Sequence, residues 1–359
     1  MPVFRLFLTG DYLDERGEVT VGDIGLDMIK DAPHIQVGFL EDQKPSPGEE
    51  NYWDRLYSLE VGSDHIAGAN GLVIFRPWVK ASAFVRGAGD LVAIGRAGAG
   101  YDKIDLEACT ANDVVVFNAP DTLVHSTASA ALTLILALAK RLKEHERLAR
   151  SGRWDRQGKI MGDDLAGQTL GIVGLGKTGA ELARLVSPFE MRVLAYSPHA
   201  DPRQAGERGI TLVSRLEEVL READFVSLHC RLEDRTRGMF GEREFRLMKR
   251  TAYFINVARG EIVQQAALVR GLQEGWIAGA GLDVFEREPL PVSDPLPDFE
   301  NVILTPHWLA STRQAGRATM RSVMRGILRV AEGHIPENVV NTEVLSRQGF
   351  LKKLSRFSA

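Results

Sequence analysis

The chain has 359 residues, of which 44% are hydrophobic and 26% charged, a composition typical of a globular protein rather than a disordered or fibrous one. Its 44 Lys and Arg residues are balanced by 48 Asp and Glu residues, which disfavours binding to nucleic acid or to an anionic membrane. The two cysteines, Cys109 and Cys230, are too few for a disulfide framework, and the most apolar stretch, residues 128–139, is too short to span a bilayer. We therefore expect a cytoplasmic protein with a large core.

Short apolar runs separated by mixed polar segments predict buried parallel strands in the first third of the chain. These runs are Phe4–Leu8, His34–Phe39, Gly71–Phe75, Leu91–Gly95 and Val114–Asn118. After them, residues 127–148 are predicted to form one long helix, apolar first and charged later.

A second series of apolar runs follows at the spacing of strand–helix units in a parallel sheet. The runs are Leu170–Val173, Arg192–Tyr196, Phe225–Leu228, Ala252–Asn256, Gly279–Val284 and Val302–Thr305. A last helix is expected over residues 314–331. The pattern predicts an α/β protein with two doubly wound parallel-sheet domains. Residues 1–120 and 310–345 would form one domain, residues 121–309 the other, and residues 346–359 a modestly basic tail.

A glycine-rich loop follows the first strand of the second series. In the sequence from Gly174 to Gly179, Gly174 permits a tight turn, Gly176 allows a pyrophosphate to approach the backbone, and Gly179 allows the helix to pack against the strand. A helix is expected over residues 180–185, and its N-terminal N–H groups would attract phosphates. Lys177 and Thr178, in the loop before it, would also contact the cofactor. The loop predicts a dinucleotide-binding site.

The strand at residues 192–196 is followed by Ser197, where dinucleotide-binding proteins usually carry an Asp or Glu that binds the adenosine ribose. Without that carboxylate nothing repels a 2′-phosphate, and His199 and Arg203 could offer it positive charge. Alternatively, Ser197 binds the ribose of NAD and the basic residues are merely solvated. The sequence leaves NAD and NADP open, with a slight preference for accepting NADP.

Three polar residues follow three late strands, at the sheet edge where open α/β sheets bind ligands: Arg259, Glu288 and His307. Hydride transfer to a ketone requires a proton donor, a role suited to His. It also requires a cation that binds a substrate carboxylate, which a guanidinium does well. A carboxylate beside the His would favour the imidazolium form and orient the ring. Each residue alone has a purely structural explanation, but their joint occurrence after a dinucleotide loop favours catalysis.

The chain resembles the D-isomer-specific 2-hydroxyacid dehydrogenase family over roughly residues 70–342, including its glyoxylate/hydroxypyruvate reductases and phosphoglycerate dehydrogenase-like members. The matching segments are residues 96–105, 118–120, 170–179, 256–263, 281–289, 305–307 and 337–341. The resemblance implies a flavodoxin-like substrate domain, a Rossmann cofactor domain, NAD or NADP as cofactor, no metal, and a homodimer.

The resemblance also implies individual roles. Arg259 would orient the substrate, His307 would be the acid/base and Glu288 its partner. Ala258 and Asp283 would contact the cofactor, with Asp283 near the nicotinamide carboxamide. On the substrate side, the loop Gly98, Ala99 and Gly100 would offer N–H groups to the substrate carboxylate, and Arg76 would add either a substrate contact or a structural salt bridge.

These features favour reversible NAD(P)-linked reduction of a 2-oxo acid to a D-2-hydroxy acid. Two alternatives remain: a phosphite-type dehydrogenase, and a dinucleotide-sensing, corepressor-like regulator on the same fold, because fold alone does not determine function. Trp308, next to His307, would shape the substrate pocket.

Overall fold

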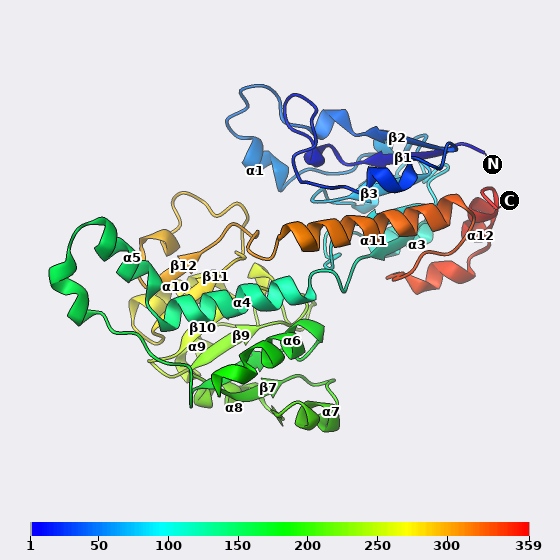
Figure 1. Ribbon diagram of the computed structural model, residues 1–359. Coiled ribbons are helices and arrows are strands. Elements are labelled where there is room, and N and C mark those ends of the chain that lie inside the picture. Colours follow the sequence, from blue (N-terminus) through cyan, green and yellow to red (C-terminus); the bar gives the residue numbers. More distant parts are fainter. Residues whose placement is uncertain (1, 359) are drawn as a thin grey trace. The chain divides into compact units, whose positions relative to one another are not determined.

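The computed structural model describes residues 2–358, and the chain divides into two compact units (Figure 1). Unit 1 comprises Met1–Leu123 and Ser311–Ala359, and unit 2 comprises Val124–Ala310. Both units are α/β, each built on a parallel sheet, which confirms the predicted fold class.

Unit 1 contains a five-stranded parallel sheet with the strand order β2-β1-β3-β4-β5. The strands are β1 (Phe4–Leu8), β2 (Ile35–Phe39), β3 (Gly71–Ile74), β4 (Ala93–Arg96) and β5 (Val115–Asn118). The central strand β3 is fully buried, as expected for a parallel strand covered on both faces. The chain runs outward from β1 to β2 on one side and from β3 to β5 on the other, so the topological switch point lies between β1 and β3.

Helices cover both faces of this sheet. On one face lie α2 (Ser63–Ile66) and α3 (Leu106–Ala111), and on the other lie α11 (Arg313–Ala331) and α12 (Gln348–Ser355). A further short helix, α1 (Tyr52–Leu56), packs in a small cluster with Leu59. The long helix α11 buries Val323 and Ile327 in the same core as Phe117 of β5. The tail also joins this core, because Phe350 of α12 is fully buried and the rings of Phe357 and Phe4 meet edge to face at 5.0 Å.

Unit 2 contains a seven-stranded parallel sheet with the order β12-β11-β10-β9-β6-β7-β8. Its strands are β6 (Thr169–Val173), β7 (Arg192–Tyr196), β8 (Ile210–Val213), β9 (Phe225–Leu228), β10 (Tyr253–Asn256), β11 (Gly279–Leu282) and β12 (Val302–Leu304). The sequence did not indicate β8. It is a short edge strand in which only Ile210 is buried, so it lacks the continuous apolar run of the central strands.

The helices of unit 2 differ from the prediction in one place. They are α4 (Val124–Ala139), α5 (Leu142–Arg150), α6 (Lys177–Val186), α7 (Pro202–Glu207), α8 (Leu216–Glu222), α9 (Glu242–Leu247) and α10 (Gln265–Gln273). The prediction of a single helix over residues 127–148 is wrong, because Arg141 takes a left-handed conformation with φ of 49° and separates α4 from α5. A left-handed residue cannot continue a right-handed helix.

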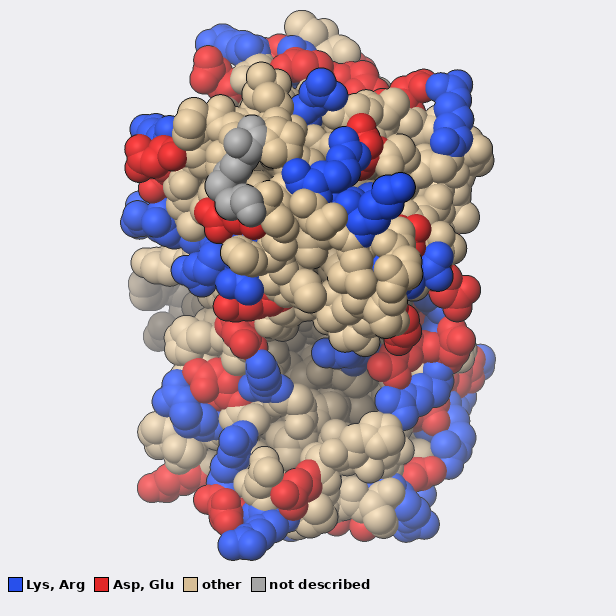
Figure 2. Space-filling view, turned by 90° about the vertical axis from the view of Figure 1, so that its right-hand side faces the viewer, with Lys and Arg blue, Asp and Glu red and all other residues tan. Residues whose placement is uncertain are grey.

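On the face shown in Figure 2, Lys and Arg side chains alternate with Asp and Glu side chains, and neither sign of charge dominates. This mixture agrees with the near balance of charges in the sequence. Among residues 2–358, no helix is both long and apolar enough to cross a membrane.

Candidate active site

The loop between β6 and α6 is shaped by three glycines with different tasks. Gly174 has φ of +98°, and a Cβ there would come within 2.5 Å of the Cys230 nitrogen. A Cβ at Gly179 would come within 2.5 Å of the Gly174 carbonyl oxygen, so the helix can approach the strand only without a side chain. Gly176 instead faces open space, with nothing within 4 Å of its Cβ position. A phosphate group can approach the backbone there, so the loop fits a dinucleotide.

Helix α6 begins directly after this opening. Gly176 is its N-cap, and Lys177 and Thr178 are its first two residues. The first N–H groups of a helix have no acceptor within the helix and attract anions. The predicted phosphate-binding residues therefore lie together on one loop and one helix start.

A group of polar residues gathers beyond the end of β7. Ser197 is half-buried directly after the strand, and Nη1 of Arg235 lies 2.7 Å from Nε2 of His199. Arg235 also contacts Glu233, with 2.8 Å between Nε and Oε2. Arg203 instead pairs with Glu207 at 3.3 Å. The sequence interpretation missed Arg235, since it comes from the loop after β9 and not from the segment after β7.

Arg259 is fixed by the turn that follows β10. The side chain of Asn256, 1% exposed, accepts a hydrogen bond from the Ala258 N–H at 3.0 Å and donates one to the Arg259 carbonyl at 3.0 Å. Gly260 packs so closely on the main chain of Phe285 that a Cβ would lie 1.9 Å from the carbonyl carbon. This packing holds the Arg259 turn beside the loop that leads to Glu288.

His307 and Glu288 are in direct contact. Nδ1 of His307 lies 2.8 Å from Oε2 and 3.0 Å from Oε1 of Glu288, and Oε1 also accepts a hydrogen bond from the Phe285 N–H at 3.1 Å. Burial raises the pKa of Glu288, but the hydrogen bond and charge of His307, the Phe285 N–H and the charge of Arg259 outweigh it. The pKa of Glu288 therefore lies below its usual range. The carboxylate is thus ionised and orients the imidazole ring.

Asp283 organises the turn that carries His307. Its side chain is buried, and its Oδ1 accepts hydrogen bonds from the Thr305 hydroxyl at 2.6 Å and from the N–H groups of Trp308 at 3.0 Å and Leu309 at 3.1 Å. Burial raises the pKa of Asp283 against the effect of these bonds. His307 itself has φ of +53°, an unusual conformation for a residue with a Cβ, and the bonds to Asp283 on its C-terminal side hold the turn in this form.

The remaining predicted residues lie in unit 1. Arg76 follows β3, and its main-chain N–H donates to Oδ2 of Asp11 at 3.0 Å. In the loop after β4, the carbonyl of Ala99 accepts a hydrogen bond from the Asn118 side chain at 2.6 Å. The N–H of Gly98 is already donated to the Arg96 carbonyl at 2.9 Å. The sequence interpretation missed Asp11, although it follows a strand of the same sheet and the rule that selected Arg259 also applies to it.

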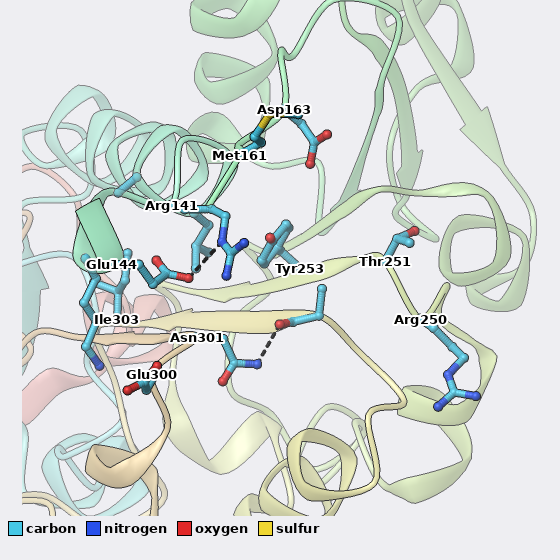
Figure 3. Close-up of a pocket in the computed structure, with 14 residues that line it drawn as sticks. Arg141, Glu144, Met161, Asp163, Arg250, Thr251, Tyr253, Glu300, Asn301 and Ile303 are labelled. Atoms are coloured by element: carbon cyan, nitrogen blue, oxygen red, sulfur yellow. Dashed lines mark hydrogen bonds and ion pairs between the residues drawn. The ribbon is translucent and has the colours of Figure 1, made fainter. Parts of the chain in front are cut away.

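A cavity of about 300 Å³ lies at the opposite edge of the unit 2 sheet (Figure 3). Tyr253 and Asn301, which line it, stand at the amino ends of β10 and β12, whereas Arg259 and His307 follow the carboxyl ends. Figure 3 shows acidic and basic side chains around it, with Arg141 paired to Glu144. None of the predicted site residues lines this cavity.

Comparison with known proteins shows the family to which the chain belongs. Residues 132–308 match the model for the D-isomer specific 2-hydroxyacid dehydrogenase, NAD binding domain. A glyoxylate reductase of Korarchaeum cryptofilum is 43% identical over 249 residues, which are 68% of this chain and 75% of that protein. A D-3-phosphoglycerate dehydrogenase of Methanocaldococcus jannaschii is 40% identical over 251 residues, 70% of this chain and 48% of that protein.

The solved structures include a protein of the same overall fold. The TT0316 protein from Thermus thermophilus superposes with a TM-score of 0.78 and 31% identity, covering 94% of this chain and all of that one. These matches confirm the resemblance found in the sequence motifs. The chain belongs to the D-isomer specific 2-hydroxyacid dehydrogenase family and is an NAD-dependent oxidoreductase.

Proposed function

We propose that the protein reversibly reduces a 2-oxo acid to a D-2-hydroxy acid, with His307 as the acid/base. The observation that carries this proposal is the contact of His307 Nδ1 with both carboxylate oxygens of Glu288, beside the charge of Arg259. An imidazole held at Nδ1 by an ionised carboxylate presents Nε2 as its reactive nitrogen.

The proton and charge transfers follow from these positions. A nicotinamide cofactor bound at the loop after β6 would supply the hydride for the carbonyl carbon of the substrate. As the C=O π bond breaks, its electron pair moves to oxygen, which takes the proton from Nε2 of His307 and becomes the hydroxyl group. Glu288 stabilises the imidazolium before the transfer and keeps the ring in place afterwards. The guanidinium of Arg259 binds the substrate carboxylate and polarises the carbonyl.

Unit 1 would contribute anion-binding groups. The Gly98 N–H already donates a hydrogen bond to the Arg96 carbonyl. The substrate carboxylate would therefore accept hydrogen bonds from the N–H groups of Ala99 and Gly100. Arg76 would add a cation on the same substrate. Because the similar protein of Korarchaeum cryptofilum is a glyoxylate reductase, glyoxylate is the first substrate to test.

The cofactor would be NAD or NADP, with NADP accepted. Ser197 presents no carboxylate that would repel a 2′-phosphate. The contact of Arg235 with His199 places a guanidinium beside His199, two residues after Ser197. Glu233 offsets part of the charge of Arg235. We therefore expect the protein to accept NADP without excluding NAD. Ala258 and Asp283 would lie near the nicotinamide.

A homodimer is part of the proposal. Large apolar side chains are exposed along α5 and the segment that follows it: Leu142 at 58%, Trp154 at 65% and Met161 at 78%. Burial of such residues against a second copy would remove apolar surface from water. Light scattering coupled to size-exclusion chromatography would give twice the chain mass.

The reaction is tested by following the absorbance of NADH and then NADPH with glyoxylate, hydroxypyruvate, pyruvate and bulkier 2-oxo acids. The proposal expects turnover with at least one acid and loss of turnover in Arg259→Ala, with cofactor binding nearly unchanged. Binding of the cofactor without turnover of any 2-oxo acid would contradict the proposal.

A further inference from the structure

The topological switch point of unit 1 carries a second group of charged residues. In open α/β sheets, ligands bind beyond the carboxyl ends of strands at the point where the strand order reverses. In the order β2-β1-β3-β4-β5 this point lies between β1 and β3. The residues that follow these two strands are residues 9–12 and residues 75–76.

Asp11, from the first of these segments, is bound to the second. Its side chain is only 4% exposed. Its Oδ2 accepts a hydrogen bond from the main-chain N–H of Arg76 at 3.0 Å and lies 3.6 Å from Nη1 of the same residue. The neighbouring Thr9 makes a parallel link, because its hydroxyl oxygen accepts a hydrogen bond from the Phe75 N–H at 3.2 Å. The residues after β1 therefore bind two consecutive main-chain N–H groups after β3, those of Phe75 and Arg76.

Aromatic rings support the same guanidinium. The Arg76 guanidinium carbon lies 4.1 Å from the centre of the Phe75 ring, a cation–π distance. Phe75 also stacks on the ring of Tyr12, at 5.2 Å with 22° between the planes. Tyr12 is fixed in turn by burial and by a hydrogen bond from its hydroxyl to the Met320 sulfur at 3.4 Å. The orientation of Arg76 is thus set by a carboxylate and by a stack of two rings.

The charge of the group favours an anionic ligand. Burial raises the pKa of Asp11, while Thr9, Arg76 and Arg96 act against burial and favour the ionised form. The guanidinium of Arg76 is the group in this arrangement that suits an anion, because it can donate two parallel hydrogen bonds to a carboxylate. A buried carboxylate is costly unless it is paired, and Asp11 is paired through Oδ2 with Arg76, while Thr9 and the charge of Arg96 also favour its ionised form.

We propose that Asp11 is a positioning residue for the substrate, one that fixes Arg76 as a second anion-binding group for the 2-oxo acid at the switch point of unit 1. The inference rests on the proposed function. The positioning role of Asp11 differs from a purely electrostatic role, in which its negative charge would cancel that of Arg76 and weaken anion binding. In that case its neutralisation would lower KM for the substrate, whereas loss of positioning raises it.

The test is a double-mutant cycle with Asp11→Asn, Arg76→Gln and both together, using steady-state kinetics of the full-length protein. Asp11→Asn should raise KM for the 2-oxo acid about tenfold, the order expected from losing one hydrogen bond to a charged group. KM for the nicotinamide cofactor should stay unchanged. In the double variant, kcat/KM should equal that of Arg76→Gln alone, because Asp11 acts only through Arg76.

Asp224→Asn is the matched control. Asp224 also binds a main-chain N–H, that of Thr169 at 2.9 Å, and a cation, Lys249 at 2.7 Å, but it lies at the amino end of β9. Its substitution should leave both KM values unchanged. If Asp11→Asn is recovered unfolded, Asp11→Glu replaces it, since the longer side chain displaces the carboxylate and should raise KM similarly.

Unchanged or lower substrate KM in the Asp11 variant, with active wild-type protein, would overturn this inference alone. Additive losses in the double variant would also overturn it. A wild-type protein that is inert toward every 2-oxo acid would overturn the proposed function, and the role of Asp11 with it.

Discussion

Replacement of Glu288 by Gln removes a charge from the contact between Glu288 and His307 with almost no change in shape. The carboxylate contacts Nδ1 of His307 through both oxygens, at 2.8 Å and 3.0 Å, and is held by the Phe285 N–H at 3.1 Å. The amide retains one acceptor oxygen but cannot stabilise the imidazolium by charge. We expect kcat for 2-oxo acid reduction to fall roughly 5- to 30-fold.

The magnitude follows from the kind of hydrogen bond that is lost. A hydrogen bond to a charged group contributes about 1.5–3 kcal/mol and a neutral one about 0.5–1.5 kcal/mol. The difference of about 1–2 kcal/mol corresponds to roughly 5- to 30-fold in rate, at about 1.4 kcal/mol per tenfold. An amide that turns its NH₂ group toward Nδ1 would impose the wrong ring tautomer and increase the loss.

The assay compares kcat at saturating substrate with cofactor affinity, measured by quenching of protein fluorescence. Glu286→Gln serves as the matched control, since Glu286 is exposed two residues away and accepts a hydrogen bond from the Gln265 N–H instead. It should retain the wild-type rate. A kcat of Glu288→Gln within twofold of wild type, in correctly folded protein, would refute the assignment of Glu288 as the partner of His307.

Three further predictions concern the cofactor, the tail and pH. Ser197→Asp should lower the kcat/KM ratio of NADPH to NADH at least about tenfold, because a carboxylate would repel the 2′-phosphate; an unchanged ratio would show that Ser197 does not face that group. Phe350→Ala should destabilise the protein by about 3–5 kcal/mol in urea unfolding, as expected for removing a fully buried ring, and a loss below about 1 kcal/mol would contradict docking of the tail. The interactions with His307, which outweigh burial, hold the pKa of Glu288 below its usual range. Ionised Glu288 therefore stabilises the fold at pH values above its unfolded-state pKa of about 4.3. This stabilisation is lost as the pH falls through its lower pKa in the folded state. The Tm difference between wild type and Glu288→Gln should shrink at acid pH, and a difference that grows there would contradict the sign.

The sequence predicted the central strands well, because burial on both faces imposes a continuous apolar run. The fully buried strand β9 begins and ends where the pattern placed it. The same holds for β1 and β7, in which three of five residues are buried. The edge strand β8 escaped detection because a half-exposed strand needs no such run. The break at Arg141 was also invisible, since nothing about an arginine between Lys140 and Leu142 distinguishes a left-handed residue from a helical one.

For the site, residue type and place after a strand selected Arg259, Glu288 and His307 as candidates, and the structure brings Glu288 and His307 into contact. The residues that support them were harder to recognise. Asp283 binds the turn that carries His307 through hydrogen bonds to main-chain groups, which the sequence does not display. Arg235 and Asp11 each act across two loops that are distant along the chain, so their partners became apparent only from the fold.

The most direct test of the central claim is the single-turnover rate of His307→Ala with the best 2-oxo acid, measured alongside cofactor affinity. If His307 donates the proton, the rate should fall by about 10²- to 10⁴-fold, the usual contribution of general acid catalysis, while the cofactor Kd stays unchanged. A variant that binds the cofactor normally and reduces the acid at the wild-type rate would contradict the account.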